Sequence, residues 1–146
     1  MIYFVDEDST QLTPYIVELE LRGYQVVPID NADDAYKVLS GASDIQLVIL
    51  DIMLAAGPSG TSRFSRERTH DFILTGLALL EDLNNTNAAH FPRRVVVFSM
   101  ANQDWVVNDI RKAAEQYQIA YLQKRDYPSP FGFGEKIAEI LKGLGS

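Results

Sequence analysis

The chain has 146 residues, of which 47% are hydrophobic and 23% charged, and its formal net charge is −7. The length suits one domain with a sizeable core, and the composition excludes a disordered chain. The negative charge argues against nucleic acid or an anionic membrane surface as a direct partner. Without cysteine, a basic leader or an apolar run near the roughly 20 residues of a membrane span, we expect a cytoplasmic protein without disulfides or membrane insertion.

Short apolar runs and helical periodicities alternate along the chain. In chain order they predict strand Ile2–Val5, helix Leu12–Leu21, strand Tyr24–Ile29, a helix between its cap Asn31 and Gly41, strand Gln46–Asp51, helix Phe72–Leu83, strand Val95–Phe98, helix Gln103–Tyr117, strand Ile119–Leu122 and a helix from Pro130. The apolar positions expected to be buried on these helices include Leu19, Ala35, Val38, Leu39, Leu80, Leu83, Trp105, Ile110, Ile137 and Leu141. Five strands alternating with five helices predict an α/β fold with a parallel sheet and helices on both faces.

One segment, Ala55–His70, interrupts this rhythm. It has no clear period, and it is longer than most connections in α/β units. It carries Arg63, Arg66 and Arg68 in an otherwise acidic chain. We consider two interpretations: a mobile surface decoration, or an element that docks an acidic partner or covers Asp51. A second polar loop is expected at Asn84–His90, and residues 1–144 are expected to form a single domain, with Gly145-Ser146 excluded as a cloning remnant.

Functional groups stand where four of the predicted strands end: Asp6 and Glu7, Asp51, Ser99, and Lys124. Chemistry in open α/β sheets takes place at the carboxyl ends of the strands. Carboxylates packed at neighbouring strand ends repel one another unless a cation intervenes, and a hard ion with oxygen ligands such as Mg²⁺ suits them. With a lysine and a hydroxyl beside them, the carboxylates suit an incoming phosphoryl group, with Asp51 as the nucleophile.

At these positions the sequence resembles the receiver domain of bacterial two-component response regulators. The matching motifs are Phe4-Val5-Asp6-Glu7-Asp8, Leu50-Asp51-Ile52-Met53-Leu54, Val97-Phe98-Ser99 and Tyr121-Leu122-Gln123-Lys124. They occur in the order that the family has them. The resemblance covers nearly the whole chain except Ala55–His70, and it implies a flavodoxin-like (βα)5 sheet with strand order 2-1-3-4-5.

The resemblance also implies a role for each matching residue. Asp51 accepts a phosphoryl group from a sensor histidine kinase or a histidine phosphotransfer protein. Asp6, Glu7, Asp51 and the Met53 carbonyl hold Mg²⁺, and Lys124 pairs with the phosphoryl group. Ser99 then moves toward that group and Tyr121 changes rotamer, which remodels a surface for a downstream target protein. Such a domain assists its own phosphorylation and dephosphorylation but is not otherwise an enzyme.

Three further departures from the family pattern surround Asp51. Glu7 replaces the more usual aspartate, which shifts a carboxylate by one methylene. Met100 follows Ser99, where a small residue is usual, and is expected to restrict access to Asp51. Arg125 follows Lys124 in place of proline, so we expect a trans bond there, because a non-proline cis bond costs about 2.5–4 kcal/mol.

Several alternatives remain open on these residues. A receiver-shaped interaction domain that is not phosphorylated would suit Met100 and Arg125. A metal-dependent phosphohydrolase needs a second carboxylate two residues after the nucleophile, where this chain has Met53. A flavodoxin-like cofactor binder lacks its glycine-rich phosphate loop here. Trp105 is expected to pack, or to take part in docking with the arginines as an exposed tryptophan.

Overall fold

The computed structural model describes residues 1–8, 10–57, 62–86 and 94–145. Strands and helices alternate through these ranges, as predicted. The strands are β1 Ile2–Val5, β2 Val26–Ile29, β3 Leu47–Leu50, β4 Val95–Ser99 and β5 Ala120–Gln123. The α-helices are α1 Thr13–Leu21, α2 Ala32–Gly41, α3 Thr75–Thr86, α4 Asp104–Tyr117 and α5 Pro130–Gly143, and a short 3₁₀ helix, η1, covers Lys124–Asp126.

The strands form one parallel sheet with the order β2-β1-β3-β4-β5. Val5 is in register with Leu50, and Leu50 with Val97, so β1, β3 and β4 end at the same edge. This order confirms the predicted doubly wound architecture. It also places the residues that follow these strands beside one another.

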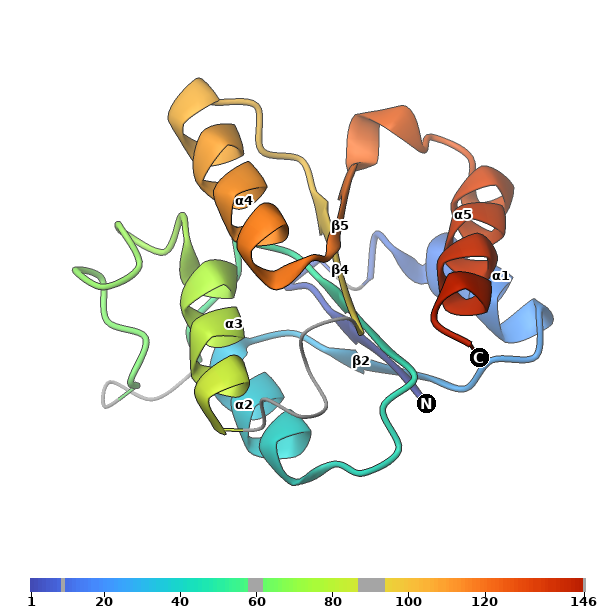
Figure 1. The fold of residues 1–146 in the computed structure, drawn as a ribbon, viewed down its shortest axis with the longest axis horizontal. Coiled ribbons are helices and arrows are strands. Elements are labelled where there is room, and N and C mark those ends of the chain that lie inside the picture. The colour runs from blue at the N-terminus through green and yellow to red at the C-terminus, as the bar shows by residue number, and fades with distance from the viewer. Residues whose placement is uncertain (9, 58–61, 87–93, 146) are drawn as a thin grey trace.

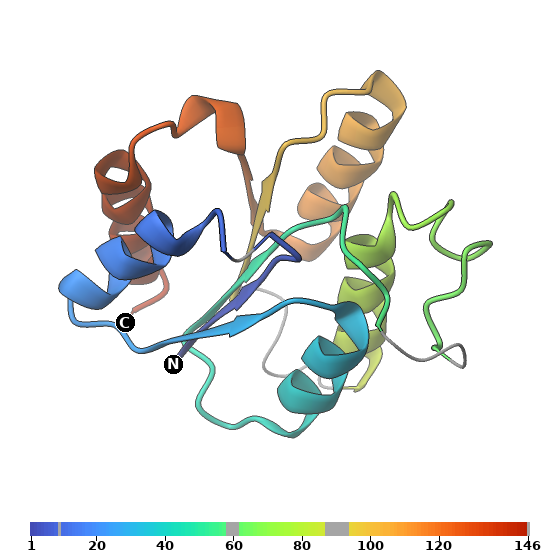
Figure 2. The same ribbon diagram turned by 180° about the vertical axis from the view of Figure 1, so that it is seen from behind.

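Two hydrophobic clusters cover the two faces of the sheet. Alternate strand residues such as Val5, Leu50 and Val97 belong to one cluster, and their neighbours Phe4 and Ile49 belong to the other. Figure 1 shows α2, α3 and α4 on the first face and α1 and α5 on the second, and Figure 2 shows the same two layers from behind. Burial on both faces explains why the strands read as unbroken apolar runs rather than alternating ones.

Most helix positions agree with the predicted periodicity, and Asn31 caps α2 by accepting a hydrogen bond from the Asp34 amide at 2.9 Å. Two predictions of burial are wrong. Val38 is 42% exposed and Trp105 is 45% exposed. Val38 lies on α2 beside the outer strand β2, where no further strand covers it, and it lines an open cavity there.

The start of α3 also differs from the prediction, which placed it at Phe72. Residues His70, Asp71 and Phe72 all have left-handed backbone angles, with φ of 52°, 57° and 68°, so a right-handed helix cannot include them. The helix begins at Thr75 and continues to Thr86, which takes in the first part of the loop expected at Asn84–His90. The rest of that loop lies outside the described residues.

Residues 62–74, which form the later described part of the long connection, extend sideways beyond α3 (Figure 1) but are anchored to the core. Phe64 is 1% exposed and belongs to the cluster under α2 and α3, and Thr69 is fully buried. We call this stretch the 62–74 segment. None of the helices in the described ranges is long and apolar enough to cross a membrane.

Candidate functional site at the carboxyl edge of the sheet

Four of the predicted residues lie together, largely buried, at the carboxyl edge of the sheet. Asp6 follows β1, Asp51 follows β3, Ser99 ends β4 and Lys124 follows β5. The exposed fractions of Asp6, Asp51 and Ser99 are 1%, 8% and 1%. Polar groups are rarely buried to this degree without a partner or a function.

Lys124 joins the two buried carboxylates. Its Nζ donates a hydrogen bond to Asp6 Oδ2 at 2.7 Å and lies 3.5 Å from Asp51 Oδ2. The other oxygen of Asp6 accepts a hydrogen bond from the Asp8 amide at 2.8 Å. One ammonium group therefore balances two carboxylates, and the cluster keeps an excess negative charge.

This crowding changes the protonation of Asp51 and Lys124. Burial, and then repulsion by Asp6, raise the pKa of Asp51 from 3.8 to about 7, although Lys124 acts against this. Burial by itself would lower the pKa of Lys124, but the charges of Asp51 and Asp6 outweigh it and raise that pKa. A second cation beside Asp51 would favour its ionised form.

The predicted metal ligands are only partly assembled. Asp6 and Asp51 face a common ammonium group, whereas Glu7 is exposed and makes no ion pair with it. Partial burial, and then the charges of Asp8 and Asp6, still raise the pKa of Glu7. Across the described ranges, no three Asp, Glu or His side chains are close enough to bind one ion. The pair Asp6 and Asp51 nevertheless suits a hard divalent cation, because these oxygens already share a positive charge. The Met53 carbonyl accepts no hydrogen bond within those ranges.

The two predicted switch residues, Ser99 and Tyr121, differ in how their hydroxyl groups are bonded. Ser99 Oγ accepts a hydrogen bond from the Ala101 amide at 3.2 Å. Tyr121 packs against the cluster under α4, and its hydroxyl is buried with no partner among the described residues. Such an unpaired hydroxyl costs roughly 1–3 kcal/mol.

The two unusual residues next to the site do not displace its groups. Met100 is 63% exposed, and with Asp8, Tyr15 and Lys124 it lines a cavity of about 230 Å³ beside the site rather than filling it. No peptide bond in the described ranges is cis, as expected for Lys124-Arg125. Arg125 turns back to Gln123 at 2.8 Å, and Lys124 still reaches both carboxylates.

Gly76 is a site residue that the sequence did not reveal. A Cβ atom on Gly76 would lie 2.3 Å from the backbone oxygen of Asp51 and 2.7 Å from Cα of Ile52, so no larger residue fits. The Gly76 amide donates to the Ile52 carbonyl at 2.8 Å. The amino end of α3 therefore holds the backbone of the Asp51 loop, and the only sequence signal was a glycine inside a helical pattern.

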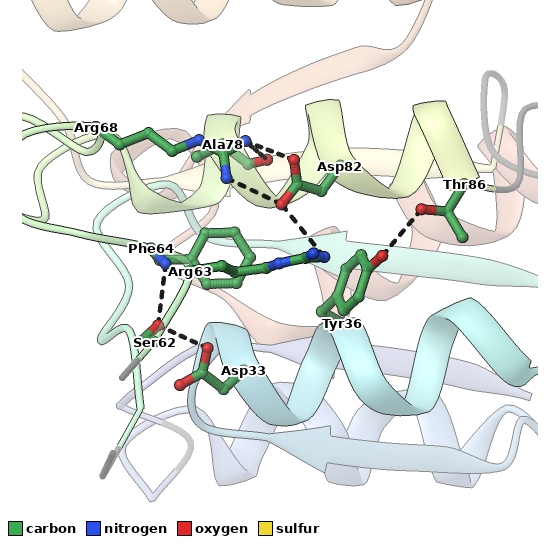
Figure 3. A network of polar contacts seen from close by, with 9 residues as sticks. All are labelled: Asp33, Tyr36, Ser62, Arg63, Phe64, Arg68, Ala78, Asp82 and Thr86. Atoms are coloured by element: carbon green, nitrogen blue, oxygen red, sulfur yellow. Dashed lines mark hydrogen bonds and ion pairs between the residues drawn. The ribbon is translucent and has the colours of Figure 1, made fainter. Parts of the chain in front are cut away.

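Two arginines of the 62–74 segment, Arg63 and Arg68, form ion pairs within the chain (Figure 3). Arg68 makes a bidentate pair with Asp82 on α3, at 2.5 Å and 3.0 Å, and Arg63 approaches the same carboxylate at 3.6 Å. The guanidinium of Arg63 also lies 4.1 Å from the centre of the Tyr36 ring. These contacts hold the segment against α2 and α3, and the single carboxylate of Asp82 balances one of the two positive charges.

Arg66 and Trp105 are more accessible. Arg66 pairs with Asp71 at 3.2 Å, with both side chains more than two-thirds exposed. Trp105 lies in the first turn of α4, where its ring meets the His70 ring edge-on at a centroid distance of 5.9 Å. His70 is an exposed loop residue, and nothing in the sequence pattern indicated this contact.

No protein-family model and no curated protein matches the chain. Solved structures do. A response regulator receiver domain protein from Methanospirillum hungatei JF-1 superposes with a TM-score of 0.67 at 20% identity, over 97% of this chain and 93% of that one. A response regulator from Burkholderia pseudomallei, solved with a phosphorylated aspartic acid and a calcium ion, gives 0.60 at 21% identity, over 96% of this chain and 65% of that one.

A third structure comes from a family described as redox sensors in the streptococci that evolved from two-component response regulators. It superposes with a TM-score of 0.71 at 13% identity, over 99% of this chain and 52% of that one. At these identities the comparisons establish the fold. The chain has the fold of a response regulator receiver domain.

Proposed function

We propose that the chain is a phosphoacceptor module of a two-component system or phosphorelay, and that Asp51 is the residue phosphorylated. The observation that carries the proposal is the shared contact of Lys124 Nζ with Asp6 and Asp51. It gathers a buried nucleophile, a second carboxylate and a cation where the fold places its chemistry. The phosphorylated aspartic acid in the Burkholderia structure supports the same assignment.

Each residue at the site has a distinct task in the proposed transfer. An Asp51 carboxylate oxygen attacks the phosphorus atom, while the bond between that phosphorus and the donor breaks and its electron pair leaves with the donor. Lys124 pairs with a phosphoryl oxygen, and the Ser99 hydroxyl donates to another. Because positioning and charge neutralisation dominate phosphoryl transfer, these residues need no other covalent chemistry.

Mg²⁺ is the proposed cofactor, and Asp6, Asp51 and the Met53 carbonyl would hold it, with Glu7 acting through water. When bound, the ion supplies positive charge to the phosphoryl oxygens. The pKa of Asp51, about 7, means that a cation also promotes the ionised nucleophile near neutral pH.

The proposed partners are a sensor histidine kinase or a histidine phosphotransfer protein, which supplies the phosphoryl group, and a downstream protein, which reads it. Beyond assisting its own phosphorylation and dephosphorylation, the chain performs no catalysis in this proposal. We place it in the cytoplasm, where kinases have access to ATP.

The test is Mg²⁺-dependent labelling by acetyl phosphate, followed by intact-mass spectrometry. We expect the native chain to gain one phosphoryl group, and EDTA or Asp51→Asn to prevent this. Asp8→Asn removes an exposed neighbouring carboxylate and should leave labelling intact. If neither acetyl phosphate labels the native chain nor beryllofluoride binds it, as followed by ¹⁹F NMR, the proposal fails.

A second candidate is a receiver-shaped interaction domain that is not phosphorylated. The exposed Glu7 and the lack of a three-ligand acidic cluster in the described ranges favour it. The streptococcal structure belongs to a family whose description gives it a function other than a response regulator's. Failure of labelling with a normally folded chain would support this candidate.

A further inference from the structure

The 62–74 segment contains an unusual backbone turn. His70, Asp71 and Phe72 are three consecutive non-glycine residues in the left-handed region, with φ between 52° and 68°. L-residues rarely adopt this conformation even singly, because Cβ then approaches the following carbonyl oxygen. Strained backbone of this kind persists where the surrounding structure enforces it, and it often occurs at functional positions.

Thr69 enforces the turn. Its side chain is fully buried, and its hydroxyl donates to the Ser65 carbonyl at 2.7 Å and accepts from the Phe72 amide at 3.0 Å. The Asp71 amide adds a hydrogen bond of 2.7 Å to the Arg66 carbonyl. The turn is therefore built into the structure, and it fixes where the side chain of His70 points.

The side chain of His70 contacts α4. Its ring packs edge-on against Trp105, at a centroid distance of 5.9 Å. His70 belongs to the connection that follows Asp51, and Trp105 follows Ser99 by way of the β4–α4 loop. The contact therefore joins the two loops that carry the proposed phosphoacceptor and the proposed hydroxyl switch.

The two sides of the contact are held by different interactions. The 62–74 segment is fixed by Phe64 and Thr69, which are buried, and by the pairs of Arg63 and Arg68 with Asp82. On the other side, the chain leading into α4 is held by the buried Ala101 and Val106 and by the Ser99–Ala101 hydrogen bond of 3.2 Å. If the Ser99 hydroxyl turns toward a phosphoryl group on Asp51, Oγ leaves the Ala101 amide, and the chain leading into α4 loses this one hydrogen bond.

We propose that the 62–74 segment is a built-in clasp on α4, closed through His70 and Trp105 and opened when Asp51 is phosphorylated. The inference rests on the proposed function and extends it. In the closed form the His70 ring covers part of Trp105. Trp105 is already 45% exposed, and opening increases that exposure, so the state of Asp51 changes the outer surface at this position.

Trp105 makes the clasp measurable, because it is the only tryptophan in the chain. The experiment follows its emission and its quenching by acrylamide, with and without Mg²⁺ and beryllofluoride. His70→Asn removes the ring but keeps a residue that tolerates the left-handed region. Glu67→Gln is the matched control, an exposed residue of the same segment that forms no hydrogen bond or ion pair within the described ranges.

We expect beryllofluoride to raise the Stern–Volmer constant of the native chain and of Glu67→Gln by roughly 1.5- to 2-fold, as one population replaces another. His70→Asn should have the raised value from the start and change little. As a second measurement on the native chain, nuclear Overhauser effects between the His70 and Trp105 rings should be present before the addition and absent after it.

The occupancy of Asp51 is read separately, by ¹⁹F NMR of the bound beryllofluoride. If Asp51 is occupied while the quenching and the ring contact do not change, the clasp is refuted and the proposed function stands. An equal change in His70→Asn and the native chain also refutes it. If beryllofluoride does not bind and acetyl phosphate does not label the chain, both proposals fail together.

Discussion

Lys124 Nζ lies 2.7 Å from Asp6 Oδ2, closer than it lies to Asp51. The resting ammonium is thus bonded mainly to the carboxylate that is not the proposed nucleophile. The side chains of Lys124 and Asp6 are both almost entirely buried. Each is strongly dependent on the other, because a buried charge without a counter-ion is very unfavourable.

Replacing Lys124 by methionine should lower the free energy of unfolding by about 3–5 kcal/mol at pH 8 without metal, because two buried carboxylates lose their cation. Mg²⁺ should restore more stability to this variant than to the native chain, since the ion replaces the missing charge. Urea unfolding with and without Mg²⁺ measures both effects. Lys136→Met, which removes a lysine paired with the exposed Glu139, should cost less than about 1 kcal/mol.

The raised pKa of Asp51 predicts a pH dependence of stability in the absence of metal. A carboxyl group with a pKa of 3.8 when unfolded and about 7 when folded favours folding in its protonated form. Its stabilising contribution is complete below about pH 4 and is lost as the pH rises to about 7. Asp51→Asn should remove this dependence and be more stable than the native chain at pH 8 by about 2–4 kcal/mol. Equal slopes between pH 5 and pH 8 would contradict this prediction.

Substitution of Gly76 by alanine tests the packing of α3 on the Asp51 loop. The new Cβ would meet backbone atoms, which cannot move aside as a flexible side chain does. We expect a loss of about 2–3 kcal/mol in stability and a reduced rate of labelling by acetyl phosphate. Gly132→Ala in α5 meets nothing within 4 Å and should instead stabilise the chain by about 0.5–1 kcal/mol.

Asp82→Asn should weaken the attachment of the 62–74 segment, because both Arg63 and Arg68 lose their carboxylate. Since these arginines are partly exposed, we expect a loss of only about 1 kcal/mol, together with faster amide exchange in the segment. Asp71→Asn breaks the exposed pair with Arg66 and places a favourable residue at a left-handed position. No loss of stability is expected there, and thermal unfolding of both variants measures the difference.

Tyr121→Phe removes a buried hydroxyl that has no partner in the described part of the chain. It should stabilise the resting form by about 1 kcal/mol. The matched variant Tyr15→Phe removes a hydroxyl that donates to the Tyr127 carbonyl at 2.6 Å, and should lose about the same amount. The same sign of change in both variants would show that the Tyr121 hydroxyl finds a partner in solution.

The sequence by itself determined the sheet and the identity of the residues at its edge. Strands buried on both faces must be apolar throughout, so the polar residue that ends each run marks the edge. Asp6, Asp51 and Ser99 could therefore be assigned to one site before their distances were known, whereas Lys124, which comes after Gln123, was assigned by its place among these groups. Glu7 follows the same strand as Asp6, but only the structure shows that it is exposed and makes no ion pair with Lys124.

Only the tertiary structure decided how the long connection behaves. Four features have no periodic pattern in the sequence that would predict them. They are the left-handed turn at residues 70–72, the closeness of Gly76 to the Asp51 loop, the pairing of Arg63 and Arg68 with Asp82, and the contact of His70 with Trp105. Periodicity records which face of a regular element is buried. These features instead depend on contacts between residues of different elements and on backbone angles outside the regular regions, and only the folded chain defines both.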